Sequence, residues 1–181
     1  MTGRGLETAD ANRDAPIKSI DVLIVGVGIS GIGMAVHLRK NCPNRRFLLV
    51  DRRDDIGGTW DLFQYPGIRS DSDMHTLGFS FEPWTEQKAI ADGPSIIEYL
   101  HRIKRKYDLE PYIRLGRKVV SASWSSDEAR WTVTLEHSDG GSSHMHAAFL
   151  YMGAGYYDYD EKGKRTEYWK GLQYQAQHPA K

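Results

Sequence analysis

The sequence has little of several things, and each shortage excludes a class of protein. It has a single cysteine in 181 residues, Cys42, which excludes an intramolecular disulfide framework and fits a reducing compartment such as the cytoplasm. It has no excess of either charge, with 24 basic and 24 acidic residues, so no long-range field favours nucleic acid or an anionic membrane. We therefore expect small-molecule partners and no nucleic acid.

Long apolar runs are also scarce. The stretch from Ile20 to Leu38 approaches the length of a membrane span, but it contains Asp21, His37 and four glycines, so we expect no transmembrane segment. Residues 1–19 lack the apolar core of a signal peptide, and they have too few apolar side chains to offset the entropy of ordering. We expect a disordered tail there.

A glycine-rich motif follows this tail. Residues 21–33 have the sequence DVLIVGVGISGIG, an apolar strand that leads into a turn and then into a helix of small residues. The pattern is typical of dinucleotide binding: Gly26 permits the tight turn, Gly28 lets a pyrophosphate approach the backbone, and Gly31 lets the helix lie against the sheet. The N–H groups at the positive end of the helix would face the phosphates. The alternative is that these glycines serve packing alone.

A second apolar strand completes a βαβ unit. We expect strands at about 20–26 and 46–51 with a helix at about 29–41 between them. The second strand ends in Asp51, twenty residues beyond Gly31, where a ribose-binding carboxylate is expected. Because the apolar runs are continuous, the sequence predicts a parallel α/β domain of the Rossmann type with both faces of its sheet covered.

The rest of the chain divides into three parts. Residues 52–74 combine turn formers, aromatics and charges without any period, and such long irregular segments usually have a function. Ser95 is the expected N-cap of a helix that extends to about Tyr107. From 112 to 152, alternating polar and apolar residues predict an antiparallel β-meander with a turn at 139–141.

Two histidines in the predicted meander raise the question of a metal site. His144 and His146 lie two residues apart, so they share one face of their strand. No third ligand of suitable spacing is evident, so we expect exposed polar side chains and no metal there.

Several motifs together resemble the flavin-containing monooxygenases of the Baeyer-Villiger and N- or S-oxygenating type. They are GGTW at 57–60, YPGIRSD at 65–71 and TLGFSF at 76–81, and the resemblance covers about residues 20–160. It is strongest to the bacterial ethionamide-activating branch of the family. It implies FAD and NADPH as cofactors. It also implies oxygenation of a ketone, sulfide, thioamide or amine-like substrate with O₂ through a C4a-(hydro)peroxyflavin.

The resemblance also implies a set of cofactor-binding residues, but no catalytic residue. Asp51 stands where most relatives have Glu and would hold the adenosine ribose, and the backbone of Val119 would meet the adenine. The positions that hold the FAD pyrophosphate are Gly26, Gly28, Ser30 and Gly31. Those that line the flavin and its ribityl chain are Thr59, Trp60, Asp61 and Leu62. Those that lie near the flavin and the nicotinamide cofactor are Arg69, Ser70 and Asp71. Without the resemblance, Arg69 and Asp71 could equally form a surface ion pair.

The family pattern is incomplete in these 181 residues. They contain no second glycine-rich strand, turn and helix for NADPH, and His178 alone keeps the Baeyer-Villiger linker fingerprint. The resemblance therefore implies the first segment of an FAD-binding domain at 20–155 and a linker toward an absent NADPH domain at 156–181. An incomplete sheet predicts a partner chain that covers it.

Three functions are compatible with this pattern. The first is the FAD-binding part of an FAD- and NADPH-dependent monooxygenase, and the second is a catalytically inactive FAD-binding remnant of such an enzyme. The third is a small NAD-dependent reductase, in which Asp51 would bind the NAD ribose. The GGTW and YPG motifs argue against the reductase.

Overall fold

The structure is a computed structural model that describes residues 19–155. Of the predicted tail at 1–19, residues 1–18 lie outside the described residues, as do the predicted linker at 156–181 and His178. The prediction was wrong for Ser19, which is the first residue of the first strand. In chain order the elements are β1 (Ser19–Val25), α1 (Ile29–Asn41), β2 (Phe47–Val50), α2 (Thr59–Leu62), α3 (Met74–Leu77), α4 (Gly93–Lys106), the 3₁₀ turn η1 (Glu110–Tyr112), β3 (Ile113–Arg114), β4 (Arg117–Ser125), β5 (Arg130–His137) and β6 (Ser142–Met152).

The described strands form one mixed sheet in the order β3-β2-β1-β6-β5-β4. Strands β3, β2, β1 and β6 are mutually parallel, whereas β6, β5 and β4 are antiparallel neighbours. The long strand β6 belongs to both halves, because residues 142–147 pair with β5 and residues 146–152 pair with β1. The predicted α/β fold with an antiparallel meander is confirmed, and the meander continues the parallel sheet through β6.

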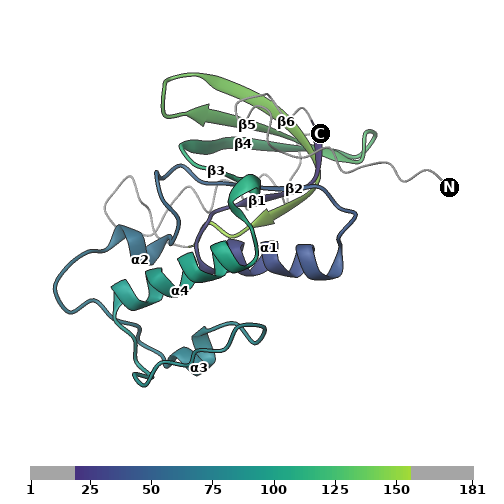
Figure 1. The fold of residues 1–181 in the computed structure, drawn as a ribbon. Coiled ribbons are helices and arrows are strands. Elements are labelled where there is room, and N and C mark those ends of the chain that lie inside the picture. Colours follow the sequence, from purple (N-terminus) through teal and green to yellow (C-terminus); the bar gives the residue numbers. More distant parts are fainter. Residues whose placement is uncertain (1–18, 156–181) are drawn as a thin grey trace.

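Both faces of the parallel half are covered (Figure 1). Helices α1 and α4 lie on one face, where Ile24 of β1 packs in a core with Val36 and Leu100. The meander lies over the other face, where Leu23 of β1 shares a second core with Val133 of β5. All five of these side chains are fully buried, and each contributes about 1.5–3 kcal/mol of hydrophobic stabilisation.

Helix α4 begins earlier than the sequence predicts. Its N-cap is Asp92 and not Ser95, because the Asp92 carboxylate Oδ1 accepts hydrogen bonds from the Ser95 backbone N (3.0 Å) and from Ser95 Oγ (2.6 Å). These bonds, with the one from the Ser95 hydroxyl first, lower the pKa of Asp92. Pro94 fits the first turn, where a helix needs no N–H donor.

The predicted meander also begins later than expected. Ile113 pairs in parallel with Leu49 of β2, so β3 extends the parallel half of the sheet. A strand of two residues is too short to show an alternation of polar and apolar side chains, so the sequence does not distinguish it from the antiparallel strands that follow. The meander itself and its turn are confirmed, with the Gly141 N–H donating to Asp139 Oδ1 (2.9 Å).

The two histidines of β6 have partners within the sheet. His144 Nδ1 lies 3.1 Å from the Thr134 hydroxyl, and His146 Nδ1 lies 3.1 Å from the Thr132 hydroxyl. These cross-strand pairs give both histidines a partner within the meander, where His144 is exposed and His146 is half-buried. Separately, none of the described helices is long and apolar enough to cross a membrane.

Candidate functional site

The glycine-rich turn joins β1 to α1 at the carboxyl end of the parallel strands. Gly26 has a φ of +103°, a conformation that L side chains rarely adopt, and its N–H donates to the Val50 carbonyl (2.8 Å). A Cβ on Gly26 would overlap the Gly153 carbonyl, and a Cβ on Gly31 would overlap the Gly26 carbonyl oxygen. Glycine is therefore required at both positions by the fold itself.

Gly28 differs from both. Its backbone is extended (φ −81°, ψ −169°), and a Cβ there would meet nothing closer than the Gly58 Cα at 3.6 Å, an ordinary van der Waals contact. The fold therefore leaves room for a side chain at position 28. Packing alone explains Gly26 and Gly31 but not Gly28, and the space beside Gly28 is open to a ligand.

The first turn of α1 is electrostatically suited to an anion. Gly28 is its N-cap and supplies no side-chain hydrogen bond, and the first turn holds no acidic residue. The N–H groups of a first turn lack helical acceptors, and the dipole of a 13-residue helix adds positive potential at this end. Ser30, the second residue of α1, is exposed, and its Oγ lies 3.1 Å from the Tyr151 hydroxyl.

Asp51 lies beside this turn, as the spacing predicts. Its Oδ2 accepts a hydrogen bond from the Val27 N–H (2.8 Å), and its Oδ1 accepts one from the Arg53 N–H (3.1 Å). The carboxylate thus joins the end of β2 to the glycine-rich turn. A carboxylate has about four lone-pair positions, so two remain for ribose hydroxyl groups.

A pocket of about 360 Å³ lies next to Asp51. The Asp51 carbonyl accepts from the Arg117 N–H (2.7 Å), and the Arg53 carbonyl accepts from the Gly116 N–H (2.9 Å), so the start of β4 is fixed beside the end of β2. The lining residues are Arg52, Arg53, Gly116, Lys118, Glu136, His137 and Ser138.

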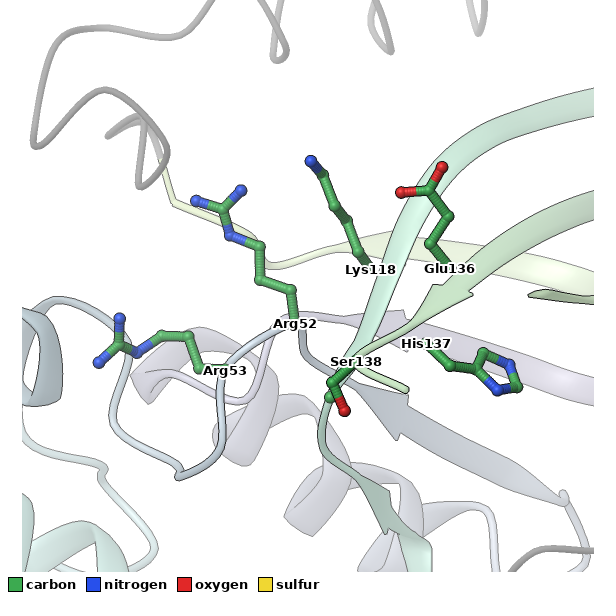
Figure 2. A pocket seen from close by; sticks show the side chains of 7 residues that line it. Arg52, Arg53, Lys118, Glu136, His137 and Ser138 are labelled. Atoms are coloured by element: carbon green, nitrogen blue, oxygen red, sulfur yellow. The ribbon is translucent and has the colours of Figure 1, made fainter. Parts of the chain in front are cut away.

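Three charged side chains project into the same space. Arg52, Lys118 and Glu136 extend to one side of the strands, whereas His137 and Ser138 point away (Figure 2). Lys118 and Glu136 are cross-strand partners in β4 and β5, which sets them side by side. Counting Arg53, the pocket lining holds three cations and one carboxylate, that of Glu136.

Val119 follows Lys118 and is 2% exposed. Its side chain packs in the core beneath the meander, with Leu135 of β5 as its cross-strand partner. Only the backbone of Val119 can therefore face a ligand, which is the part that the resemblance implies.

The predicted flavin-lining residues form α2. The loop before them lies beside the glycine-rich turn, because the Gly57 N–H donates to the Val27 carbonyl (3.0 Å). Thr59, Trp60 and Leu62 are half-buried in this short helix. The Asp61 carboxylate accepts from Arg53 Nε (2.9 Å) and from the Arg53 NH2 group, and this half-buried pair joins α2 to the end of β2.

Arg69, Ser70 and Asp71 are held against the start of α4. The Ser70 N–H donates to the Ala91 carbonyl (2.9 Å), and Arg69 forms an isolated β-bridge with Asp92. Ser70 is 3% exposed and accepts from the Ser72 N–H (3.3 Å), so it has a structural role. Arg69 and Asp71 are exposed, and within residues 19–155 they form no ion pair with each other.

Neither the charged pocket nor Tyr151 was predicted from the sequence. Arg52 directly follows Asp51, so its position at a strand end was a usable signal. The pairing of Lys118 with Glu136 and the contact of Tyr151 with Ser30 depend on strand register, which spacing along the chain does not reveal.

Comparisons with known proteins agree with the motifs. A family model described as an NAD(P)-binding Rossmann-like domain matches residues 24–91. The chain is 52% identical over 144 residues to "FAD-containing monooxygenase EthA" of Mycolicibacterium smegmatis, covering 80% of this chain and 29% of that protein. It is 46% identical over 165 residues to "Probable FAD-binding monooxygenase AlmA" of an Acinetobacter species, covering 89% and 33%. The chain thus spans about a third of the length of these relatives.

Solved structures show the same partial correspondence. An oxidized steroid monooxygenase bound to NADP superposes with a TM-score of 0.70 at 29% identity, covering 78% of this chain and 27% of that one. A cyclohexanone monooxygenase from a Rhodococcus species, bound to NADP⁺, gives a TM-score of 0.68 at 30% identity with the same coverage.

Proposed function

Since this chain is homologous to the N-terminal portion of the FAD-containing monooxygenases, we propose that it binds FAD at the carboxyl ends of β1, β2 and β6. The observation that carries the proposal is the open space at Gly28, where the fold tolerates a side chain and the sequence nevertheless has none. The first turn of α1 supports the proposal. It has no side-chain cap and no acidic residue, so its N–H groups and the positive end of the helix dipole suit a pyrophosphate.

In this proposal the adenosine part of FAD lies over the end of β2. Asp51 accepts hydrogen bonds from the ribose hydroxyl groups, and the backbone of Val119 contacts the adenine. The pocket beside Asp51 has a volume in the range of ligand sites. The planar guanidinium of Arg52 suits stacking on a purine ring, and Lys118 adds positive charge near the phosphates.

The flavin part would extend toward α2. Thr59, Trp60 and Leu62 supply a half-buried surface there, and the pair of Asp61 with Arg53 fixes α2 to the end of β2. We assign the Arg69 to Asp71 segment to the outer edge of the flavin site, where it would also approach NADPH. Bound FAD supplies the redox chemistry, and the residues of this chain bind it, orient it and restrict water around it.

Oxygenation is proposed for a larger assembly. Because the 181 residues hold no second glycine-rich motif, NADPH binding and the transfer of oxygen from O₂ to a ketone, sulfide or thioamide require the part of the relatives that this chain does not span. We propose that this assembly is cytoplasmic, since the described cysteine, Cys42, is free and exposed.

The far half of β6 is the expected contact with such a partner. Within residues 19–155, the strand from Phe149 to Met152 pairs only with β1, and Phe149 is 61% exposed. A strand edge with exposed apolar side chains favours pairing with another strand. We propose that a strand from the portion of the relatives that this chain does not span adds at this edge. With the edge uncovered, the purified chain should self-associate, and monomeric behaviour in size-exclusion chromatography, with and without FAD, would count against an open edge.

A titration with FAD tests the proposed function. The purified chain should bind FAD, as seen by the perturbed visible spectrum and the quenched fluorescence of the flavin. Gly28→Ala should lower the affinity at least about a hundredfold, because a methyl group blocks the pyrophosphate, while thermal stability stays unchanged or rises slightly. Unchanged FAD binding in Gly28→Ala would contradict the proposed site, and absent binding in the wild-type chain would contradict the proposed function.

A further inference from the structure

A pair of hydroxyl groups lies at the N-terminus of α1. Ser30 Oγ and the Tyr151 hydroxyl oxygen are 3.1 Å apart, although the two residues are separated by 121 positions in the chain. Either oxygen can act as the donor in this pair. The direction of this hydrogen bond is therefore not fixed until a third group binds to one of the two hydroxyl groups.

The fold holds the Tyr151 ring in place. Tyr151 pairs with Ile24 in the parallel ladder of β6 and β1, and its side chain packs against the core beneath α1. A Cβ built on Gly153 would lie 3.3 Å from the ring carbon Cε1 and 3.3 Å from the Gly31 backbone N. The ring thus lies beside the glycine-rich turn, and its hydroxyl group reaches the exposed Ser30.

A bound phosphate would fix the direction of the pair. A serine hydroxyl has one proton and two lone pairs, and a phosphate oxygen can only accept. If Ser30 donates its proton to the pyrophosphate, its lone pair is left to accept from the Tyr151 O–H. Hydrogen bonds to an ionised group are the stronger ones, and a donor behind the serine strengthens them further.

We propose that Tyr151 is a positioning residue for the pyrophosphate of FAD: its O–H donates to Ser30 Oγ and so directs the Ser30 proton at a phosphate oxygen. The inference rests on the proposed FAD site. Tyr151 acts through Ser30 and does not itself contact the cofactor. The tyrosine thereby makes part of the phosphate site depend on β6, far from the glycine-rich motif in sequence.

The test is a double-mutant cycle read with three ligands. Tyr151→Phe keeps the packed ring and removes only the hydroxyl, and Ser30→Ala removes the group through which it acts. We expect Tyr151→Phe to weaken the binding of FAD and of ADP about three- to tenfold and to leave adenosine, which has no phosphate, unchanged. The double variant should bind FAD no more weakly than Ser30→Ala alone.

Tyr112→Phe is the matched control. Tyr112 stacks on Phe47, and its ring centroid lies 5.4 Å from Cζ of Arg39. Because Arg39 is in the last turn of α1, Tyr112 lies near the end of that helix opposite to Ser30. This variant should bind all three ligands as the wild-type chain does.

The outcomes separate the two proposals. If the wild-type chain binds FAD and Tyr151→Phe binds it equally well, the inference is wrong and the proposed function stands. Additive losses in the double variant, or an equal loss for adenosine, would show that Tyr151 does not act through Ser30 on the phosphate. If the wild-type chain binds neither FAD nor ADP, both proposals fail together.

Discussion

The two halves of the proposed FAD site are built differently. The adenosine and pyrophosphate half lies at the ends of β1 and β2, where backbone hydrogen bonds and glycine packing fix the turn and Asp51 holds it through Val27. The flavin half lies on the four-residue helix α2 and on the segment from Arg69 to Asp71, whose contacts lead toward the start of α4.

This difference has a consequence for binding. A preorganised site loses little free energy on ordering when a ligand arrives, whereas a site on short helices and loops loses more. We therefore expect contacts with the ADP part of FAD to supply most of the binding free energy of this chain. The flavin part would depend on the portion of the relatives that the chain does not span.

The largest expected effect concerns the adenosine and pyrophosphate half, the rigid half of the site. Gly31→Ala places a methyl group on the Gly26 carbonyl oxygen, a backbone atom that cannot move aside without opening the turn. We expect the free energy of unfolding to fall by about 3 kcal/mol or more, measured by urea denaturation. An unchanged free energy of unfolding in Gly31→Ala would show that the turn can move to accommodate the methyl group. Gly28→Ala is the control that leaves stability intact.

Asp51→Ala should have the next largest effect, on affinity. It removes the acceptor for the ribose and two bonds to the backbone at Val27 and Arg53, so FAD and ADP should bind about ten- to hundredfold more weakly in a calorimetric titration. Asp54→Ala, at an exposed position on the same loop, is the control and should bind normally. Equal losses in the two variants would indicate a general charge effect.

Tyr99→Phe tests α4, because the Arg69 to Asp71 segment of the flavin half is held against the start of this helix. The buried Tyr99 hydroxyl donates to the Glu82 carbonyl (2.6 Å) and accepts from the Phe79 N–H (2.8 Å), and burial raises its pKa. Its removal should cost about 1–2 kcal/mol of stability in urea denaturation, because two backbone groups lose their partner. ADP affinity should not change, and a loss of ADP binding would mean that the two halves are coupled.

The smallest effect is a pH dependence at α4. The Asp92 pKa is lowered by its bonds to Ser95, so its cap stabilises the fold above the ordinary value of 3.8, and this contribution is lost as the pH falls through the lower folded value. Asp92→Ala should cost about 1 kcal/mol of stability at pH 7 and progressively less below pH 3.8, measured by thermal unfolding at each pH. A difference that persists undiminished in acid would exclude the carboxylate as the cap.

The rigid half is also the half that sequence reasoning predicted well. Continuous apolar runs, the glycine spacing and the distance from Gly31 to Asp51 are local signals of the βαβ unit, and each found its expected place. The predicted N-cap of α4, Ser95, was wrong. Asp and Ser are both good N-caps, and the packing of Ile96 and Leu100 does not distinguish between the two positions.

The features that the sequence did not predict depend on strand register or on a strand that changes its pairing partner. β3 joins β2 over two residues, and β6 changes partner from β5 to β1 within one strand, so neither leaves a periodic signal. The pocket formed by Arg52, Lys118 and Glu136 exists only once β4 is paired with β5 beside the end of β2.

The most direct measurement compares the affinities of the purified chain for FAD, ADP and FMN by isothermal titration calorimetry. We expect ADP to bind within about tenfold of FAD, because the adenosine and pyrophosphate contacts lie on the rigid half. FMN, which lacks adenosine, should bind at least about a hundredfold more weakly than FAD. FMN binding as tightly as FAD, with no measurable ADP binding, would show that the flavin half and not the rigid half supplies the affinity.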